Sequence, residues 1–303
     1  STVMSRMDDT EVRGRLRAQI HEEQHRKTLR PVGLPIGVLA IDGKTVWTGN
    51  EKVNAFCQRS HQEDGTPYWH FRVVRAVLVS AAAPVCVDQA PIPAETNDMG
   101  VLPSFLDALR REYGRSRLFE VLTMDAGFCS EANAREIDGA GLGYVFGLKG
   151  NQPELLAEAR RILLPLANTT RPDAVSAWER EDGKRVQRRF WRTREMAGWL
   201  NWSHLRQVWL VRRVEQEDGG PEVVVDEPAQ LAQATDLRER EVRERRLLAA
   251  REPGHVGVAE DVRRMLVEAL VRDRPADLGE LGSPAEHLAA RLQHLLRGAR
   301  TLV

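Results

Sequence analysis

The sequence has 303 residues, of which 42% are hydrophobic and 29% are charged, and its formal net charge at pH 7 is zero. These values are ordinary for a globular protein, and they allow one large domain with an insertion or two modest domains. No apolar run is long enough to span a bilayer and the N-terminus is polar, so we expect no membrane association, no signal peptide and a cytoplasmic location.

Cysteine content also excludes some classes of protein. The three cysteines show no C-x-x-C spacing, which argues against a disulfide framework or a zinc site. The sequence also lacks the glycine-rich fingerprints of nucleotide-binding loops. His21 and His25 have helical i, i+4 spacing, but with no evident third ligand they indicate a solvated helix face. A neutral chain can still bind nucleic acid through a local basic face.

The first predicted elements are extended. Residues 1–33 are polar and are expected to form a helical lead-in. The short apolar run 37–41 predicts a buried strand, and 44–47 predicts a second extended run. A further strand is expected over 68–79 and a shorter one over 85–89.

From residue 99 the apolar residues recur at helical spacing, which predicts a helix over 99–113. A strand over 119–124, a helix from Ser130 to Ile137 and a strand over 144–148 follow. Three antiparallel strands leading into β-α-β units predict an α/β protein with a mixed sheet flanked by helices. The RNase H-like fold has this order of elements.

Composition divides the remaining sequence. We assign residues 34–165 to the core, including a helix over 154–164, and 166–245 to an inserted subdomain with basic and aromatic strands. Residues 246–303 are expected to form a divergent, charged helical segment, because the sequence has no aromatic residue after Trp209.

Two aspartates follow predicted strands: Asp42 comes after the run ending at Ile41, and Asp125 after the run ending at Met124. Carboxylates at matching heights on adjacent strands can share divalent metal ions, because neighbouring strands lie about 4.8 Å apart. Two such ions can activate a hydroxyl nucleophile and stabilise a leaving oxygen at a phosphodiester. The alternative is structural: Asp-Gly between apolar runs is a hairpin signal, and Asp125 could lie in an ordinary strand-to-helix loop.

Four ordered blocks favour the metal site. They are Val38–Thr45 (VLAIDGKT), Glu95–Met99 (ETNDM), Leu122–Ser130 (LTMDAGFCS) and Tyr144–Gln152 (YVFGLKGNQ). The first and third resemble the two aspartate blocks of bacterial insertion-sequence DDE transposases of the H-repeat-associated type. The second is similar to that group's S/T-N-E block, and the fourth to its Y-x-x-x-x-K-x-N-Q stretch.

The resemblance implies a DNA transposase with an RNase H-like core. Asp42 and Asp125 would be catalytic metal ligands for Mg²⁺ or Mn²⁺, and the substrate would be double-stranded DNA at insertion-sequence ends and targets. Lys44, Lys149, Asn151 and Gln152 are the expected DNA contacts, since amide and ammonium groups at a sheet edge suit phosphates and sugars. A homodimer and a bacterial, nucleoid-associated location are also implied. The loop after 148 could instead be an ordinary bend.

The third acid of the family is not identifiable. The family's R-x-H-W-x-I-E-N block is absent, and the nearest text has Pro275 in place of the tryptophan and Leu278 in place of the glutamate. Glu280 is the candidate replacement, with Asp277 and Glu268 as weaker ones, although each could be a surface charge. The segment could therefore be divergent or frame-shifted.

A basic stretch over 184–194 contains six cations in eleven residues and resembles the family's H-G-R-x-E-x-R segment. Arg185, Arg188 and Arg189 are the expected phosphate contacts, because in an extended strand Arg185 and Arg189 share a face. The alternative is a solvated edge strand protected by charge. The tryptophans around it are expected to be core residues.

The sequence therefore predicts a transposase that performs metal-dependent phosphodiester cleavage and strand transfer. The alternative is a catalytically inactive, degenerate DNA-binding relic lacking the third acidic residue. A structure-specific nuclease on the same fold is a third possibility.

Overall fold

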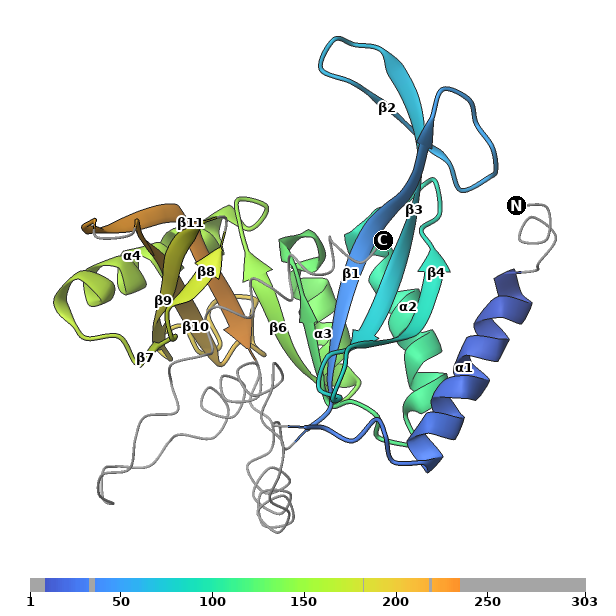
Figure 1. The fold of residues 1–303 in the computed structure, drawn as a ribbon, viewed down its shortest axis with the longest axis horizontal. Coiled ribbons are helices and arrows are strands. Elements are labelled where there is room, and N and C mark those ends of the chain that lie inside the picture. Colours follow the sequence, from blue (N-terminus) through green and yellow to red (C-terminus); the bar gives the residue numbers. More distant parts are fainter. Residues whose placement is uncertain (1–8, 33–35, 182, 218–219, 235–303) are drawn as a thin grey trace.

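The computed structural model describes residues 9–32, 36–181, 183–217 and 220–234, which form a wide sheet with helices packed against it (Figure 1). The elements in chain order are α1 (Asp9–His25), β1 (Val38–Gly49), β2 (Gln58–His61), β3 (Pro67–Leu78), β4 (Val85–Pro91), α2 (Asp98–Tyr113), β5 (Val121–Met124), the 3₁₀ turn η2 (Ala126–Phe128), α3 (Glu131–Gly139), β6 (Gly143–Leu148), α4 (Pro153–Thr169), β7 (Ala174–Val175), β8 (Glu179–Glu181), β9 (Lys184–Thr193), β10 (Gln207–Gln216) and β11 (Glu222–Ala234). None of the described helices is both long and apolar enough to cross a membrane.

The described strands form one mixed sheet. Its order is β2-β3-β1-β5-β6-β11-β10-β9-β7, with β4 added to β3 and β8 added to β9. Strand β3 is antiparallel to both β1 and β4, whereas β1, β5 and β6 run parallel to one another. Helices α2 and α3 lie behind this part of the sheet in the view of Figure 1. The predicted α/β class is confirmed, and the topology is consistent with an RNase H-like fold.

Strand β1 is longer than predicted. The runs 37–41 and 44–47 belong to one strand, and β3 pairs with it without interruption across Asp42-Gly43. The hairpin interpretation of Asp42-Gly43 is therefore wrong. The reason is that β3 is equally long and offers a partner to each residue on both sides of the Asp-Gly pair. The far ends of β1 and β3, with β2, project from the body as a ribbon (Figure 1).

Side-chain caps fix where two helices begin. Asn97 accepts a hydrogen bond from the backbone N–H of Gly100, so α2 begins at Asp98. Ser130 caps α3 in the same way, as predicted, by accepting from Asn133 N–H. Such caps satisfy N–H groups that have no partner inside the helix.

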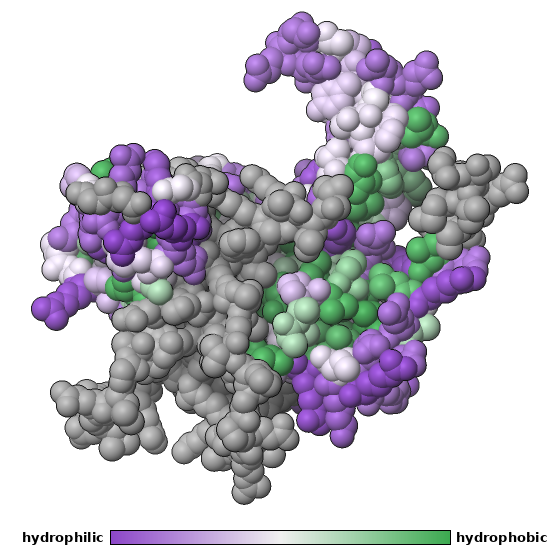
Figure 2. Space-filling view, viewed as in Figure 1, coloured by the Kyte–Doolittle hydropathy of each residue, from purple (hydrophilic) through white to green (hydrophobic). Residues whose placement is uncertain are grey.

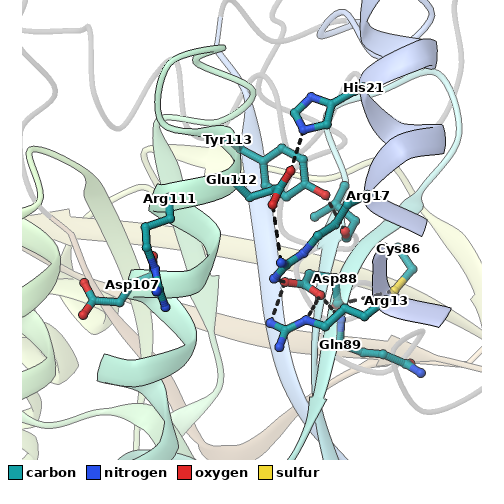
Figure 3. A network of polar contacts seen from close by, with 11 residues as sticks. Arg13, Arg17, His21, Cys86, Asp88, Gln89, Asp107, Arg111, Glu112 and Tyr113 are labelled. Carbon is teal, nitrogen blue, oxygen red and sulfur yellow. Dashed lines mark hydrogen bonds and ion pairs between the residues drawn. The ribbon is translucent and has the colours of Figure 1, made fainter. Parts of the chain in front are cut away.

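Helix α1 docks onto the core through a polar network (Figure 3). Arg13 and Arg17 both bind the carboxylate of Asp88 on β4, which is completely buried. His21, one turn further along, lies 2.7 Å from a carboxylate oxygen of Glu112 on α2. Figure 2 shows hydrophilic residues on α1 and at the tip of the ribbon, and apolar residues gathered between them over β1, β3 and β4.

The described part of the predicted insertion, residues 166–234, continues the core sheet because β11 pairs antiparallel with β6. Helix α4 extends further than the predicted 154–164 and packs on β9, β10 and β11. Trp191, Trp202 and Trp209 are buried, as expected of core residues, and Trp199 packs, partly buried, against the core cluster that contains Trp191 and Trp202. The predicted C-terminal helical segment 246–303 lies outside the described residues.

Candidate active site

Asp42 in β1 and Asp125 just after β5 directly follow paired residues of neighbouring parallel strands. The pairing of β1 with β5 runs from Val38↔Val121 to Ile41↔Met124, and the next residue after each of these segments is one of the two aspartates. Adjacent strands are separated by about 4.8 Å, and residues in register on parallel strands point to the same face. The pairing of β1 with β5 therefore brings two acids that are far apart in the sequence close together in the fold.

The negative charge of Asp42 is unfavourable in the folded protein without a metal ion. Burial, followed by the negative charge of Asp125, raises the pKa of Asp42 to about 6 from its ordinary value of 3.8. Arg75, the register partner of Asp42 on β3, opposes this rise in pKa. A divalent cation between the two carboxylates would offset their repulsion, and carboxylate oxygens are the ligands that Mg²⁺ and Mn²⁺ prefer. The donor chemistry of these two residues thus fits such an ion.

Lys44 lies two residues after Asp42 on β1 and so points to the same face of the strand. Its ammonium group is buried, and no hydrogen-bond partner for it exists among the described residues. A buried ammonium without a partner is costly, and an anionic oxygen is the partner it would take. This geometry suits a phosphate close to the two aspartates.

Asp125 is followed by the tight turn η2. Its carboxylate accepts a hydrogen bond from Gly127 N–H at 2.9 Å. The side-chain amide of Asn151 donates to the carbonyls of Ala126 at 2.7 Å and Cys129 at 3.3 Å, and that of Gln152 donates to Cys129 at 2.9 Å. The Lys-Gly-Asn-Gln stretch therefore meets the second aspartate block directly, while Lys149 within it is exposed to solvent.

A third acid near the site was not among the predicted site residues. Asp98, the first residue of α2, forms an ion pair with Arg72 on β3, and its charge also raises the pKa of Asp42. A β-carbon on Gly43 would lie only 1.9 Å from an oxygen of Asp98, so the glycine makes room for this carboxylate. The sequence signal was present, since Asp98 is the acid that follows Thr96-Asn97 in the Glu95–Met99 block.

The predicted phosphate contacts on β9 divide between its two faces. Arg185 and Arg189 are partly exposed, but Arg188 is only 1% exposed and is bound to Glu181. The expectation that Arg188 contacts DNA is therefore wrong. Strand alternation explains the result, because residue 188 falls on the buried face with Val186.

The other two arginines also have partners. Arg185 stacks over the ring of Trp178 and donates to Gln216, and Arg189 is paired with Glu222. Both lie far from the aspartates, since β9 is four strands away from β5 in the sheet, or roughly 19 Å at the usual spacing.

The candidate third ligand, Glu280, lies outside the described residues, as do Asp277 and Glu268. Within residues 9–32, 36–181, 183–217 and 220–234, no group of three or more metal-binding side chains could hold an ion. The described part of the site thus supplies Asp42 and Asp125, with Asp98 nearby but paired to Arg72, and no three-membered metal group.

The chain is similar to a known protein family and to a curated relative. The family described as transposase DDE domain matches residues 33–249. An uncharacterized protein in the dhlA 3′ region of Xanthobacter autotrophicus is 28% identical over 189 residues, which cover 60% of this chain and 55% of the relative. The chain thus spans about half the length of the curated relative that it matches.

The likeness to one solved structure is distant. The NurA nuclease from Sulfolobus solfataricus is 9% identical, with a TM-score of 0.24 and coverage of 78% of this chain and 84% of that one. This similarity is too low to carry an argument about function.

Proposed function

The chain belongs to the transposase DDE domain family, and from that premise we propose that it catalyses metal-dependent phosphodiester cleavage and strand transfer at insertion-sequence ends. The sequence blocks around Asp42, Asp98, Asp125 and Lys149 further suggest the H-repeat-associated type. Its substrate is double-stranded DNA, both at the element's ends and at the target. A homodimer follows from the need to bring two DNA ends together, and we place it in the bacterial cytoplasm near the nucleoid, where its DNA substrate lies.

The observation that supports this proposal most is that Asp42 and Asp125 each directly follow the last paired residues, Ile41 and Met124, of two parallel strands. A divalent cation bound there supplies Lewis acidity, which polarises a phosphoryl oxygen and lowers the pKa of a hydroxyl nucleophile. The two aspartates would hold Mg²⁺ or Mn²⁺, and Arg75 limits the negative charge around Asp42.

DNA contacts follow from the remaining cations. Lys44 binds the phosphate nearest the aspartates, and exposed Lys149 binds backbone next to the second aspartate block. Arg185 and Arg189, on the partly exposed face of β9, contact DNA further from the cleavage point by exchanging their present partners for phosphates.

A plasmid carrying the element's own ends provides the test. The parent protein is expected to nick and join this DNA with Mg²⁺ or Mn²⁺ but not with EDTA. Asp42→Asn and Asp125→Asn should each abolish cleavage while DNA binding in EDTA persists. Asp107→Asn, an exposed acid on α2, is the matched control and should leave cleavage unchanged. Cleavage that survives either active-site substitution would overturn the proposal.

The alternative is an inactive, DNA-binding relic. It is favoured by one observation: among the described residues, no group of three or more metal-binding side chains could hold an ion. In the same assay the relic would bind the ends but never cut them. Cutting without joining would instead indicate a nuclease. If cutting occurs, Glu280→Gln tests whether that residue completes the site.

A further inference from the structure

Asn151 and Gln152 lie between β6 and α4, and both direct their side-chain amides at the turn that follows Asp125. Their backbone segment begins where β6 ends, and β6 is the parallel neighbour of β5. Each amide donates to main-chain carbonyls 22 to 25 residues earlier in the chain. The contacts therefore join two segments that the sheet brings together.

The turn has internal bonds of its own. Phe128 N–H donates to the carbonyl of Asp125 at 3.3 Å, and Cys129 N–H donates to that of Ala126 at 3.1 Å. Three residues make a short 3₁₀ turn with poor hydrogen-bond geometry. Outside bonds from Asn151 and Gln152 to Ala126 and Cys129 therefore determine how firmly this turn is held.

Burial makes these outside bonds important. Ala126, Phe128 and Cys129 are all buried, so water cannot replace a lost donor at their carbonyls without rearrangement. The remaining carbonyl of the turn, that of Phe128, also receives an amide, from Asn133 at 2.8 Å. The carbonyls of the three buried residues, Ala126, Phe128 and Cys129, thus each accept a hydrogen bond from a side-chain amide.

Strand β6 closes the turn from the other side. A β-carbon on Gly147 would lie 3.1 Å from the backbone nitrogen of Ala126 and 3.5 Å from the carbonyl carbon of Asp125. The glycine allows the backbone after β5 to lie directly against β6. Asp125 is consequently held between β6 and the amides of Asn151 and Gln152.

We propose that Asn151 and Gln152 are positioning residues that fix the carboxylate of Asp125, and that they are not DNA contacts. This inference rests on the proposed function, because the position of Asp125 matters through the metal ion it binds. The Asn151 amide already makes two hydrogen bonds to the turn, and the Gln152 amide makes one. Lys149, which is exposed in the same stretch, is the residue left to meet DNA.

Substitutions that remove the donors test the proposal. Asn151→Leu and Gln152→Leu keep approximate size but cannot donate, whereas Gln152→Lys keeps an N–H donor. The affinity for Mn²⁺, measured by electron paramagnetic resonance without DNA, should fall about tenfold or more in the leucine variants. Affinity for end DNA in EDTA should be unchanged. Gln152→Lys should retain the Mn²⁺ affinity of the parent.

Hydrogen exchange of the turn gives a readout that needs no metal. The peptide covering residues 125–130 should exchange faster in the leucine variants, while peptides from β9 and β10 stay as in the parent. Lys149→Ala is the matched control: it should weaken DNA binding and leave both Mn²⁺ affinity and exchange unaltered.

The possible failures are distinct. Unaltered exchange and Mn²⁺ affinity in Asn151→Leu, with weakened DNA binding, would overturn the positioning role and restore the DNA-contact interpretation. Absence of Mn²⁺ binding in the parent would instead contradict the proposed function, and the exchange measurement would still decide whether the amides hold the turn.

Discussion

The ionised carboxyl group of Asp42 lowers the free energy of unfolding of the metal-free protein. Its pKa is raised to about 6 by burial and then by Asp125, above the ordinary 3.8. Between these two pH values the folded protein binds more protons than the unfolded chain, so the free energy of unfolding falls as pH rises through this window. A divalent cation bound to the ionised carboxylate would offset this loss of unfolding free energy, and the proposed chemistry requires the same cation.

Asp42→Asn should therefore stabilise the metal-free protein at neutral pH while abolishing cleavage. The expected gain is on the order of 2 kcal/mol above pH 6 and close to zero at pH 4, where the parent carboxyl is protonated. Urea unfolding in EDTA at both pH values measures it, with Asp107→Asn as the control. A gain of the same size at both pH values would show that the charge is not the cause.

At the scale of elements, close contacts tie strands and helices into fixed positions. Gly43 on β1 leaves the space that Asp98 of α2 occupies, and Arg72 of β3 holds that carboxylate by an ion pair. This contact lies one residue from Asp42. A side chain at residue 43 would displace the Asp98 carboxylate next to the site.

We expect Gly43→Ala to destabilise the fold by about 1–3 kcal/mol, because the added methyl group collides with Asp98. Loss of cleavage should accompany it. The control is Gly14→Ala in α1, where nothing lies within 4 Å of the new carbon, and a gain of about 0.5–1 kcal/mol is expected there from helix propensity. Thermal denaturation and the nicking assay together check both. Full activity in Gly43→Ala would remove the packing argument.

Helix α1 depends on Asp88, whose buried carboxylate binds Arg13 and Arg17 (Figure 3). Asp88→Ala should cost about 3 kcal/mol, because two guanidinium groups lose their shared partner. Hydrogen exchange should then increase throughout α1. Glu11→Ala, which breaks only an exposed i, i+4 pair with Arg15, should cost less than about 1 kcal/mol. Unchanged protection of α1 in Asp88→Ala would show that apolar packing alone holds the helix.

For the whole molecule, local patterns predicted what depends on local chemistry. The order of strands and helices, the Ser130 cap and the buried tryptophans followed from periodicity and residue type. The continuity of β1 through Asp42-Gly43 did not, because it depends on β3, a partner about thirty residues away. The sequence likewise named Asn151 and Gln152 but could not show that their amides meet the turn after Asp125.

The positions and partners of charged side chains were the hardest features to predict for the whole molecule. Arg188 was predicted to contact phosphate, but its ion pair with Glu181 allows its side chain to lie on the buried face of β9. Asp88 and its two arginines are separated by more than seventy positions, so nothing in the polar lead-in indicated where α1 would dock. Ion pairs of this kind are determined by the fold and have no local sequence signature.

The central claim is that Asp42 and Asp125 bind a divalent cation between neighbouring strands. Anomalous diffraction from crystals of the protein soaked in Mn²⁺ tests it most directly. We predict a peak within about 2.0–2.2 Å of an oxygen from each carboxylate, absent in crystals of Asp125→Asn. A Mn²⁺ peak that lies away from both aspartates, or one that persists unchanged in the variant, would contradict the account.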